Sequence, residues 1–211
     1  MSLEKLKQHI REIIDIENNE LDQITSAFKL VKYPPKKIIL KKGQECNFYA
    51  FITKGCLVYY SKFDEKERVI NFPREGWWIG DLDSFLSHSP SNFYLKTLEE
   101  TELWTLDYNG FMNLIQNHPN YLRFHLIKTH RSYMQIDERF AKITSLSAED
   151  KYNLMLKDSP GIINRVPSKY LASFLGIEPP SLSRIRRNMS KKIMMNDLQK
   201  LRPFLLKTNT I

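Results

Sequence analysis

The sequence lacks several features that define large classes of proteins. It has only two cysteines, Cys46 and Cys56, with no Cys-x-x-Cys pair and no Cys/His cluster at zinc-ligand spacing, so a disulfide scaffold and the common zinc modules are disfavoured. No apolar run is long enough to span a bilayer, and residues 1–15 lack the apolar centre of a signal peptide. We therefore expect a cytoplasmic protein with two free thiols and no membrane contact.

Positive charge is present, and it is concentrated near the C-terminus. The formal net charge of the chain is +8. Residues 161–211 include ten basic and two acidic residues, so this segment carries +8 and the first 160 residues are balanced. A local positive field on one small unit is typical of a protein that binds a polyanion. A solubilising surface has the same composition, so charge alone does not separate the two interpretations.

Residues 37–107 have the pattern of an antiparallel β-structure. Short runs rich in β-forming residues alternate with polar turns, several of which contain glycine, as at Gly43, Gly55 and Gly76. The expected strands cover residues 38–40, 48–53, 56–62, 69–72, 92–97 and 102–106. Many short strands at regular spacing predict a jelly roll or sandwich. Residues 3–30 have helical apolar spacing instead, which predicts helix before the sheet.

A long helix is expected after the β-region. Pro119 suits its first turn, and the apolar residues that follow have the 4-3-4-3 spacing of a coiled-coil seam. The seam consists of Leu122, Leu126, Thr129, Tyr133, Ile136 and Phe140. We predict that it joins two copies of the chain, while a second apolar face with Ile127 and Met134 covers the β-structure. The alternative is a helix that lies wholly on the core of its own domain.

Residues 166–189 have the spacing of a helix-turn-helix. Ser168 suits the cap of a first helix, Gly176 permits a tight turn, and Pro179 suits the start of a second helix. The residues expected to point inward are Leu171, Ala172, Leu175, Leu182 and Ile185. The second helix of such a unit lies in the major groove, where Arg184 would contact guanine. The full set of expected DNA contacts is Ser168, Lys169, Ser181, Arg184, Arg186, Arg187 and Lys191.

These patterns divide the chain into three parts. Residues 1–118 form a β-roll domain, residues 119–144 a dimerisation helix, and residues 145–211 a DNA-binding domain whose first helix is opened by a capping box at Ser147–Asp150. The expected fold class is α+β, with an antiparallel β-roll (jelly roll), flanking helices, the long helix and a C-terminal winged-type helix-turn-helix.

This order of parts resembles the Crp/Fnr family of bacterial transcription regulators, also called the cyclic-AMP receptor protein family. The resemblance runs from about Leu21 to Met189. It rests on Gly43, Gly55, the Gly-Trp-Trp-Ile-Gly-Asp-Leu stretch at 76–82, the long helix and residues 176–187. It implies a homodimer on a pseudo-palindromic DNA site, with RNA polymerase as a further partner and Arg184 as a base-contacting arginine. Family members that read a well-known operator have polar side chains where this chain has Pro179 and Pro180, so the target sequence must differ from that operator.

The expected effector pocket departs from the family pattern. The resemblance places it at Gly80, Asp81, Leu82, Ser91 and Asn92. Cyclic-nucleotide binders in the family have Glu in place of Asp81 and an Arg-Ser pair in the later segment, where residues 88–93 read His-Ser-Pro-Ser-Asn-Phe. A buried phosphate without its cation is left with its desolvation uncompensated. We therefore predict little or no binding of cyclic AMP, and either an unidentified small effector or none.

Other cofactors and functions have less support in the sequence. The cysteine cluster of the iron–sulfur members is missing, and no haem ligand pair stands out among the histidines at 9, 88, 118, 125 and 130. A cupin-like metalloenzyme would need several inward His and carboxylate ligands, and only His88 lies in the β-region. We expect no catalytic residue, no metal and no evident cofactor. The remaining alternative is an effector-binding or protein-interaction module without specific DNA binding.

Overall fold

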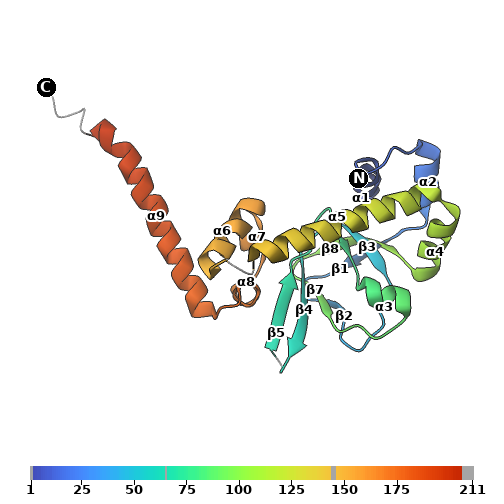
Figure 1. The fold of residues 1–211 in the computed structure, drawn as a ribbon, viewed down its shortest axis with the longest axis horizontal. Coiled ribbons are helices and arrows are strands. Elements are labelled where there is room, and N and C mark those ends of the chain that lie inside the picture. The colour runs from blue at the N-terminus through green and yellow to red at the C-terminus, as the bar shows by residue number, and fades with distance from the viewer. Residues whose placement is uncertain (1, 65, 144–145, 206–211) are drawn as a thin grey trace.

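The computed structural model describes residues 2–64, 66–143 and 146–205, and its N-terminal part is a β-roll with flanking helices (Figure 1). The strands of this part are β1 (Lys29–Tyr33), β2 (Ile38–Leu40), β3 (Tyr49–Lys54), β4 (Leu57–Phe63), β5 (Lys66–Asn71), β6 (Trp78–Ile79), β7 (Tyr94–Thr97) and β8 (Thr101–Leu106). The helices are α1 (Ser2–Arg11), α2 (Asn18–Ser26), α3 (Leu82–Ser87) and α4 (Tyr108–Asn117). The predicted β-rich fold with helices around it is confirmed.

The strands form two antiparallel sheets of four strands each within the described residues. Their orders are β1-β8-β3-β6 and β2-β7-β4-β5. The turn between β3 and β4 shows why glycine is needed at position 55: its φ is +107°, and a Cβ there would lie 2.8 Å from the Glu100 carbonyl oxygen. Because that oxygen belongs to the backbone, a side chain at position 55 would force the two turns apart.

The N-terminal residues differ from the prediction in two ways. Residues 3–30 were expected to be helical, but α1 and α2 are separate helices, and β1 already begins at Lys29. β1 pairs with β8 along its whole length, from Lys29 opposite Thr105 to Tyr33 opposite Thr101. Hydrogen bonds to a strand some seventy positions away decide the conformation here, and the local apolar spacing has no information about them.

The C-terminal part is helical. It consists of α5 (Pro119–Ile143), α6 (Ala148–Asp158), α7 (Ile162–Arg165), α8 (Ser168–Leu175) and α9 (Pro179–Leu205). α5 runs across the β-roll and leads to α6–α8, and α9 projects away from the rest of the molecule (Figure 1). Of the described helices, none is long and apolar enough to cross a membrane. The predicted helix starts at Pro119 and Pro179 are confirmed, as is the cap at Ser147, whose Oγ accepts a hydrogen bond from Asp150 N at 3.1 Å.

The prediction of a winged C-terminal unit was wrong within the part of the chain that the structure describes. No strand follows β8 there, and α9 continues for 27 residues where a wing would begin with a hairpin. The sequence accounts for this difference, because residues 190–202 contain neither glycine nor proline to form a hairpin turn. Their lysines, methionines and leucines favour helix instead.

One buried side chain of α5 is charged. Lys128 is only 7% exposed, and its Nζ lies 4.4 Å from the ring centroid of Tyr49 and 5.1 Å from that of Trp78. Burial lowers the pKa of Lys128 to about 7, while the two ring faces favour the ammonium form. The lysine therefore caps the aromatic layer between α5 and β3 without a carboxylate partner close enough to shift its pKa.

The Lys128→Met variant is expected to be more stable than wild type at and below pH 7, by about 1–3 kcal/mol. In an unfolded chain lysine titrates near pH ~10.4, so between that pH and the folded pKa of about 7 the unfolded chain binds the extra proton. Wild-type stability should then rise with pH across this window, and the advantage of the methionine should shrink. Urea unfolding at pH 6, 8 and 9.5 measures this.

The matched control for that experiment is Lys42→Met, because Lys42 is exposed. Its stability difference from wild type should be small and the same at each pH. A Lys128→Met advantage that is equally independent of pH would contradict the assignment of the effect to a buried ammonium.

Candidate nucleic-acid interface and effector pocket

The predicted helix-turn-helix segment folds as two short-linked helices, α8 and α9. Gly176 ends α8 in the left-handed conformation with φ of 72°, and the Ile177 N–H donates to the Ala172 carbonyl at 3.0 Å. The side chains predicted to point inward are all buried: Leu171, Ala172, Leu175, Leu182 and Ile185. Because both helices bury one face in the same core, the outward face of α9 is held in a fixed orientation.

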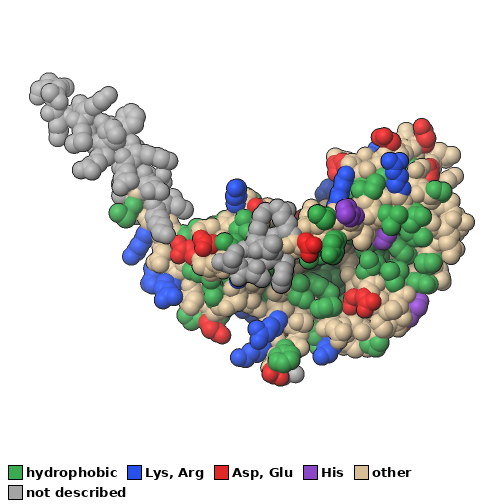
Figure 2. All heavy atoms as spheres, viewed as in Figure 1, with side chains coloured by type: hydrophobic (Ala, Val, Ile, Leu, Met, Phe, Trp, Pro, Cys, Tyr) green, Lys and Arg blue, Asp and Glu red, His purple; other side chains and the backbone are tan. Residues whose placement is uncertain are grey.

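Three of the predicted DNA contacts lie exposed on the first turns of α9. They are Arg184, Arg187 and Lys191, and Ser181 beside them is half-buried. Figure 2 shows Lys and Arg side chains gathered over this end of the helix. The arginines at 184 and 187 are one helical turn apart, so they share a face opposite the buried Leu182 and Ile185.

The other three predicted contacts make bonds within the protein. Arg186 donates from Nη1 to the Ser168 hydroxyl at 3.0 Å and from Nε to the Tyr152 hydroxyl at 3.2 Å. Lys169 Nζ lies 3.1 Å from a carboxylate oxygen of Glu67 on β5. Ser168 was expected to cap α8, but that prediction was wrong: Pro167 holds the cap position and Ser168 is the first helical residue. Sequence reasoning missed Tyr152, because nothing near it in the chain marks it as a partner of Arg186.

The predicted seam of α5 is open to solvent in the single chain. Leu126, Tyr133 and Ile136 are 60%, 60% and 65% exposed, Leu122 is also exposed and Thr129 is half-buried. Phe140 is among the residues whose side chains lie outside the described ones. On the face seen in Figure 2, hydrophobic side chains gather along α5 and in the hollow beside it.

The opposite face of α5 covers the β-roll, through other residues than those expected. Tyr121, Phe124 and Lys128 are buried there, and Ile127 packs at the margin. Met134 was expected on this face, but it is exposed. The seam therefore does not cover the core of its own domain.

Hydrogen bonds join residues of the expected effector pocket to one another and to their neighbours. Ser91 Oγ donates to the buried carboxylate of Asp81 at 2.7 Å, and the same carboxylate caps α3 by accepting from Ser84 N. The Asp81 N–H donates to Cys46 Sγ at 3.4 Å, and Cys46 N donates to Ser84 Oγ at 2.9 Å. Sequence reasoning treated Cys46 only as a free thiol, and it missed this role because the contact spans 35 positions.

Residues 30–118 match the family model of the cyclic nucleotide-binding domain. The predicted resemblance to Crp/Fnr regulators is confirmed by curated relatives named cAMP-activated global transcriptional regulator CRP. The protein of that name from Haemophilus influenzae is 29% identical over 105 residues, which are 49% of this chain and 47% of the relative. That from Salmonella typhimurium is 24% identical over 144 residues, 68% of this chain and 63% of the relative.

Both matches span less than two thirds of the length of these relatives. Among solved structures, the c-di-GMP-responsive global regulator CLP of Xanthomonas campestris superposes with a TM-score of 0.67 and 15% sequence identity. The match covers 83% of this chain and 93% of that one. At this identity it shows a shared fold, which extends well beyond residues 30–118.

Two aromatic side chains, Tyr59 and Phe93, lie near the turn at Asp81. The rings of Tyr59 and Phe93 lie 4.9 Å apart, and burial raises the pKa of the Tyr59 hydroxyl, with the charge of Asp81 adding to the effect. Asn92 is exposed, and Leu82 is half-buried at the start of α3. The predicted residues are thus brought together as a packed turn, except for Asn92, which lies outside it.

Within the described ranges, no group of three or more His, Cys, Asp or Glu side chains could hold a metal ion. His9 and His125 pack among aromatic rings, and burial lowers the pKa of each. Cys56 is fully buried, and burial raises the pKa of its thiol to about 12, so it is protonated at neutral pH.

Proposed function

We propose that this protein is a DNA-binding transcription regulator that reads a specific sequence through α9. The observation on which the proposal depends is the row of exposed basic side chains, Arg184, Arg187 and Lys191, on the first turns of a helix whose other face is fixed by a tight turn from α8. In a helix-turn-helix these turns enter the major groove. The names of the curated relatives and the shared fold support the same assignment.

The proposed active form is a homodimer. The exposed seam of α5 is the surface for a second copy, since isolated apolar rows of this length are unusual on a monomer. A twofold axis along α5 would place two α9 helices about 34 Å apart, one turn of DNA. The operator is then pseudo-palindromic. The proposed domain organisation has three parts: residues 1–118 are the β-roll domain, 119–144 the dimerisation helix and 145–211 the DNA-binding domain.

Binding of cyclic AMP is not part of the proposal. Each polar group of the turn at Asp81 described above already has a partner within the protein, and no arginine lies in residues 88–93. Isothermal titration with cyclic AMP should therefore give no saturable heat at up to about 1 mM, a level at which even weak specific sites fill. A saturable titration would contradict the prediction that the protein does not bind cyclic AMP. The two remaining possibilities are that a different small effector binds the β-roll or that the β-roll has no effector.

Selection of bound duplexes from a random pool, at fixed salt concentration, tests the proposed function. The expected result is enrichment of one pseudo-palindromic motif whose half-sites lie about one helical turn apart. Uniform, salt-sensitive binding without enrichment would count against it. The alternative, an effector-binding or protein-interaction module without specific DNA binding, would then be favoured. A regulator of the proposed kind acts in the cytoplasm, with RNA polymerase as a further expected partner.

A further inference from the structure

α8 lies against an open edge of the β-roll. β5 is the last strand of its sheet, so its outward N–H and C=O groups have no neighbouring strand. Ser173 of α8 supplies both partners: its hydroxyl accepts from Val69 N at 3.1 Å and donates to the Glu67 carbonyl at 2.7 Å. One side chain therefore completes the ladder as a residue of a further strand would. We call the Glu67–Val69 segment the docking edge.

Apolar contacts lie beside these hydrogen bonds. The rings of Phe72 and Phe174 are 5.3 Å apart, and those of Tyr60 and Tyr170 are 6.4 Å apart. Residues of β4 and of α8 share a single buried cluster. An interface of this kind holds two units in one relative orientation more firmly than a polar contact does.

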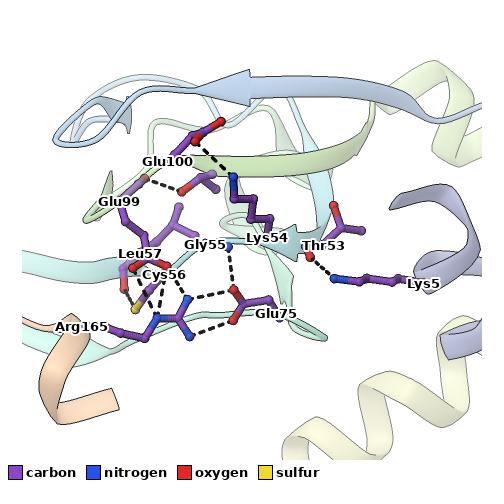
Figure 3. A network of polar contacts seen from close by, with 11 residues as sticks. Lys5, Thr53, Lys54, Gly55, Cys56, Leu57, Glu75, Glu99, Glu100 and Arg165 are labelled. Atoms are coloured by element: carbon purple, nitrogen blue, oxygen red, sulfur yellow. Dashed lines mark hydrogen bonds and ion pairs between the residues drawn. The ribbon is translucent and has the colours of Figure 1, made fainter. Parts of the chain in front are cut away.

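A charged contact fixes the other end of the same unit. Arg165 of α7 makes a two-pronged contact with Glu75, with nitrogen–oxygen distances of 2.8 and 2.9 Å, and also contacts Glu99 (Figure 3). Glu75 in turn accepts from Gly55 N at 2.8 Å. Two turns of the β-roll therefore contact one side chain of the helical unit, and a third, at Gly55, is joined to it through Glu75. The helices cannot shift on the roll without separating these charges.

At the docking edge, the predicted DNA contact Lys169 forms an ion pair within the protein. The Lys169 ammonium lies 3.1 Å from the Glu67 carboxylate, with both side chains partly exposed. A phosphate that approaches α8 meets an ammonium bound to a carboxylate, and it also meets the negative charge of that carboxylate. Because both effects oppose DNA, the position of Glu67 matters for any binding that uses this face of α8.

We propose that the docking edge regulates DNA binding: Ser173 holds α8 on β5, and there the Glu67 carboxylate competes with DNA phosphate for Lys169. The inference rests on the proposed function, which it deepens by naming how the β-roll acts on the DNA-binding unit. β4 and β5 form one hairpin, so release of α8 from this hairpin would separate Lys169 from Glu67 and leave the ammonium to DNA phosphate.

The test measures DNA affinity of the full-length protein against salt concentration for wild type, Glu67→Gln, Lys169→Ala and the double variant. Glu67→Gln should bind a fixed duplex about fivefold more tightly, the size expected for release of a surface ion pair. The salt dependence should steepen by about one unit per half-site, since each Lys169 forms one more phosphate contact. In the Lys169→Ala background the Glu67→Gln change should have a smaller effect, because only the repulsion between carboxylate and phosphate is removed there. Glu102→Gln, which removes a carboxylate paired with Lys32 on the other sheet, is the charge-matched control.

Equal gains from Glu67→Gln with and without Lys169, or an equal gain from Glu102→Gln, would overturn the competition by showing a general charge effect. Unchanged affinity and slope in Glu67→Gln would overturn it as well. A wild-type protein without any DNA binding would instead overturn the proposed function and, with it, the competition. The docking of α8 on β5 would still be tested by amide hydrogen exchange, which needs no DNA.

Amide hydrogen exchange tests the docking without DNA. Ser173→Ala should raise the exchange rate of the Val69 amide about fivefold, because that N–H loses its acceptor. The Val58 amide in β4, inside the sheet, is the internal control and should not change. Equal Val69 exchange in wild type and Ser173→Ala would show that α8 is not docked on β5 in solution, and would overturn this part of the proposal.

Discussion

Arg184→Ala should lose about 1–3 kcal/mol of operator affinity per half-site, the usual value of a bidentate arginine–guanine contact. Arg184 is exposed on the first turns of α9, so its removal should leave the fold and the thermal midpoint unchanged. Binding to unrelated duplexes should change much less, because phosphate contacts dominate there. Fluorescence anisotropy with the selected operator and with a scrambled duplex, at one salt concentration, measures both.

Lys191→Ala is the matched comparison for this variant. Lys191 is exposed on the same helix, two turns further on, and we expect it to contact phosphate. Its loss should weaken binding to operator and scrambled duplex alike and reduce the salt dependence by about one unit per half-site. If Arg184→Ala behaves in the same way, Arg184 contacts the backbone and not a base, and the assignment of specificity to it is wrong.

Leu126→Asp should convert the protein into a monomer. Leu126 is 60% exposed in the single chain, so the change costs the folded monomer little, whereas a carboxylate in the centre of an apolar dimer seam has no partner. Operator affinity should fall by roughly hundredfold or more, since one half-site no longer raises the effective concentration of the other. Sedimentation equilibrium and operator binding measure the two effects.

Met134→Asp is the control for the dimer prediction. Met134 is 53% exposed on the same helix but lies off the seam, so the same charge there should leave the dimer and the operator affinity intact. Dissociation by both variants would point to a general effect of charge on α5. A Leu126→Asp variant that remains dimeric would place the dimer contact on another surface.

The sequence by itself determined the parts whose signals are local. The turn glycine at Gly176 and the inward spacing of Leu171, Leu182 and Ile185 were sufficient to predict α8, its turn and the start of α9. The heptad spacing similarly predicted both the existence of α5 and the row of residues that it leaves exposed. A period of 3.5 or 3.6 residues is a property of neighbouring positions, so no distant contact is needed to recognise it.

Only the tertiary structure decided which polar groups meet. Ser91 with Asp81, Cys46 with Asp81 and Lys169 with Glu67 join segments that are 10 to 102 positions apart. Those contacts occupy polar groups of the expected effector pocket and a predicted DNA contact. β1 also depends on a distant segment, because it forms by pairing with β8. Hydrogen bonds of this range depend on how the sheets pair and pack, and the chain has no local pattern that records them.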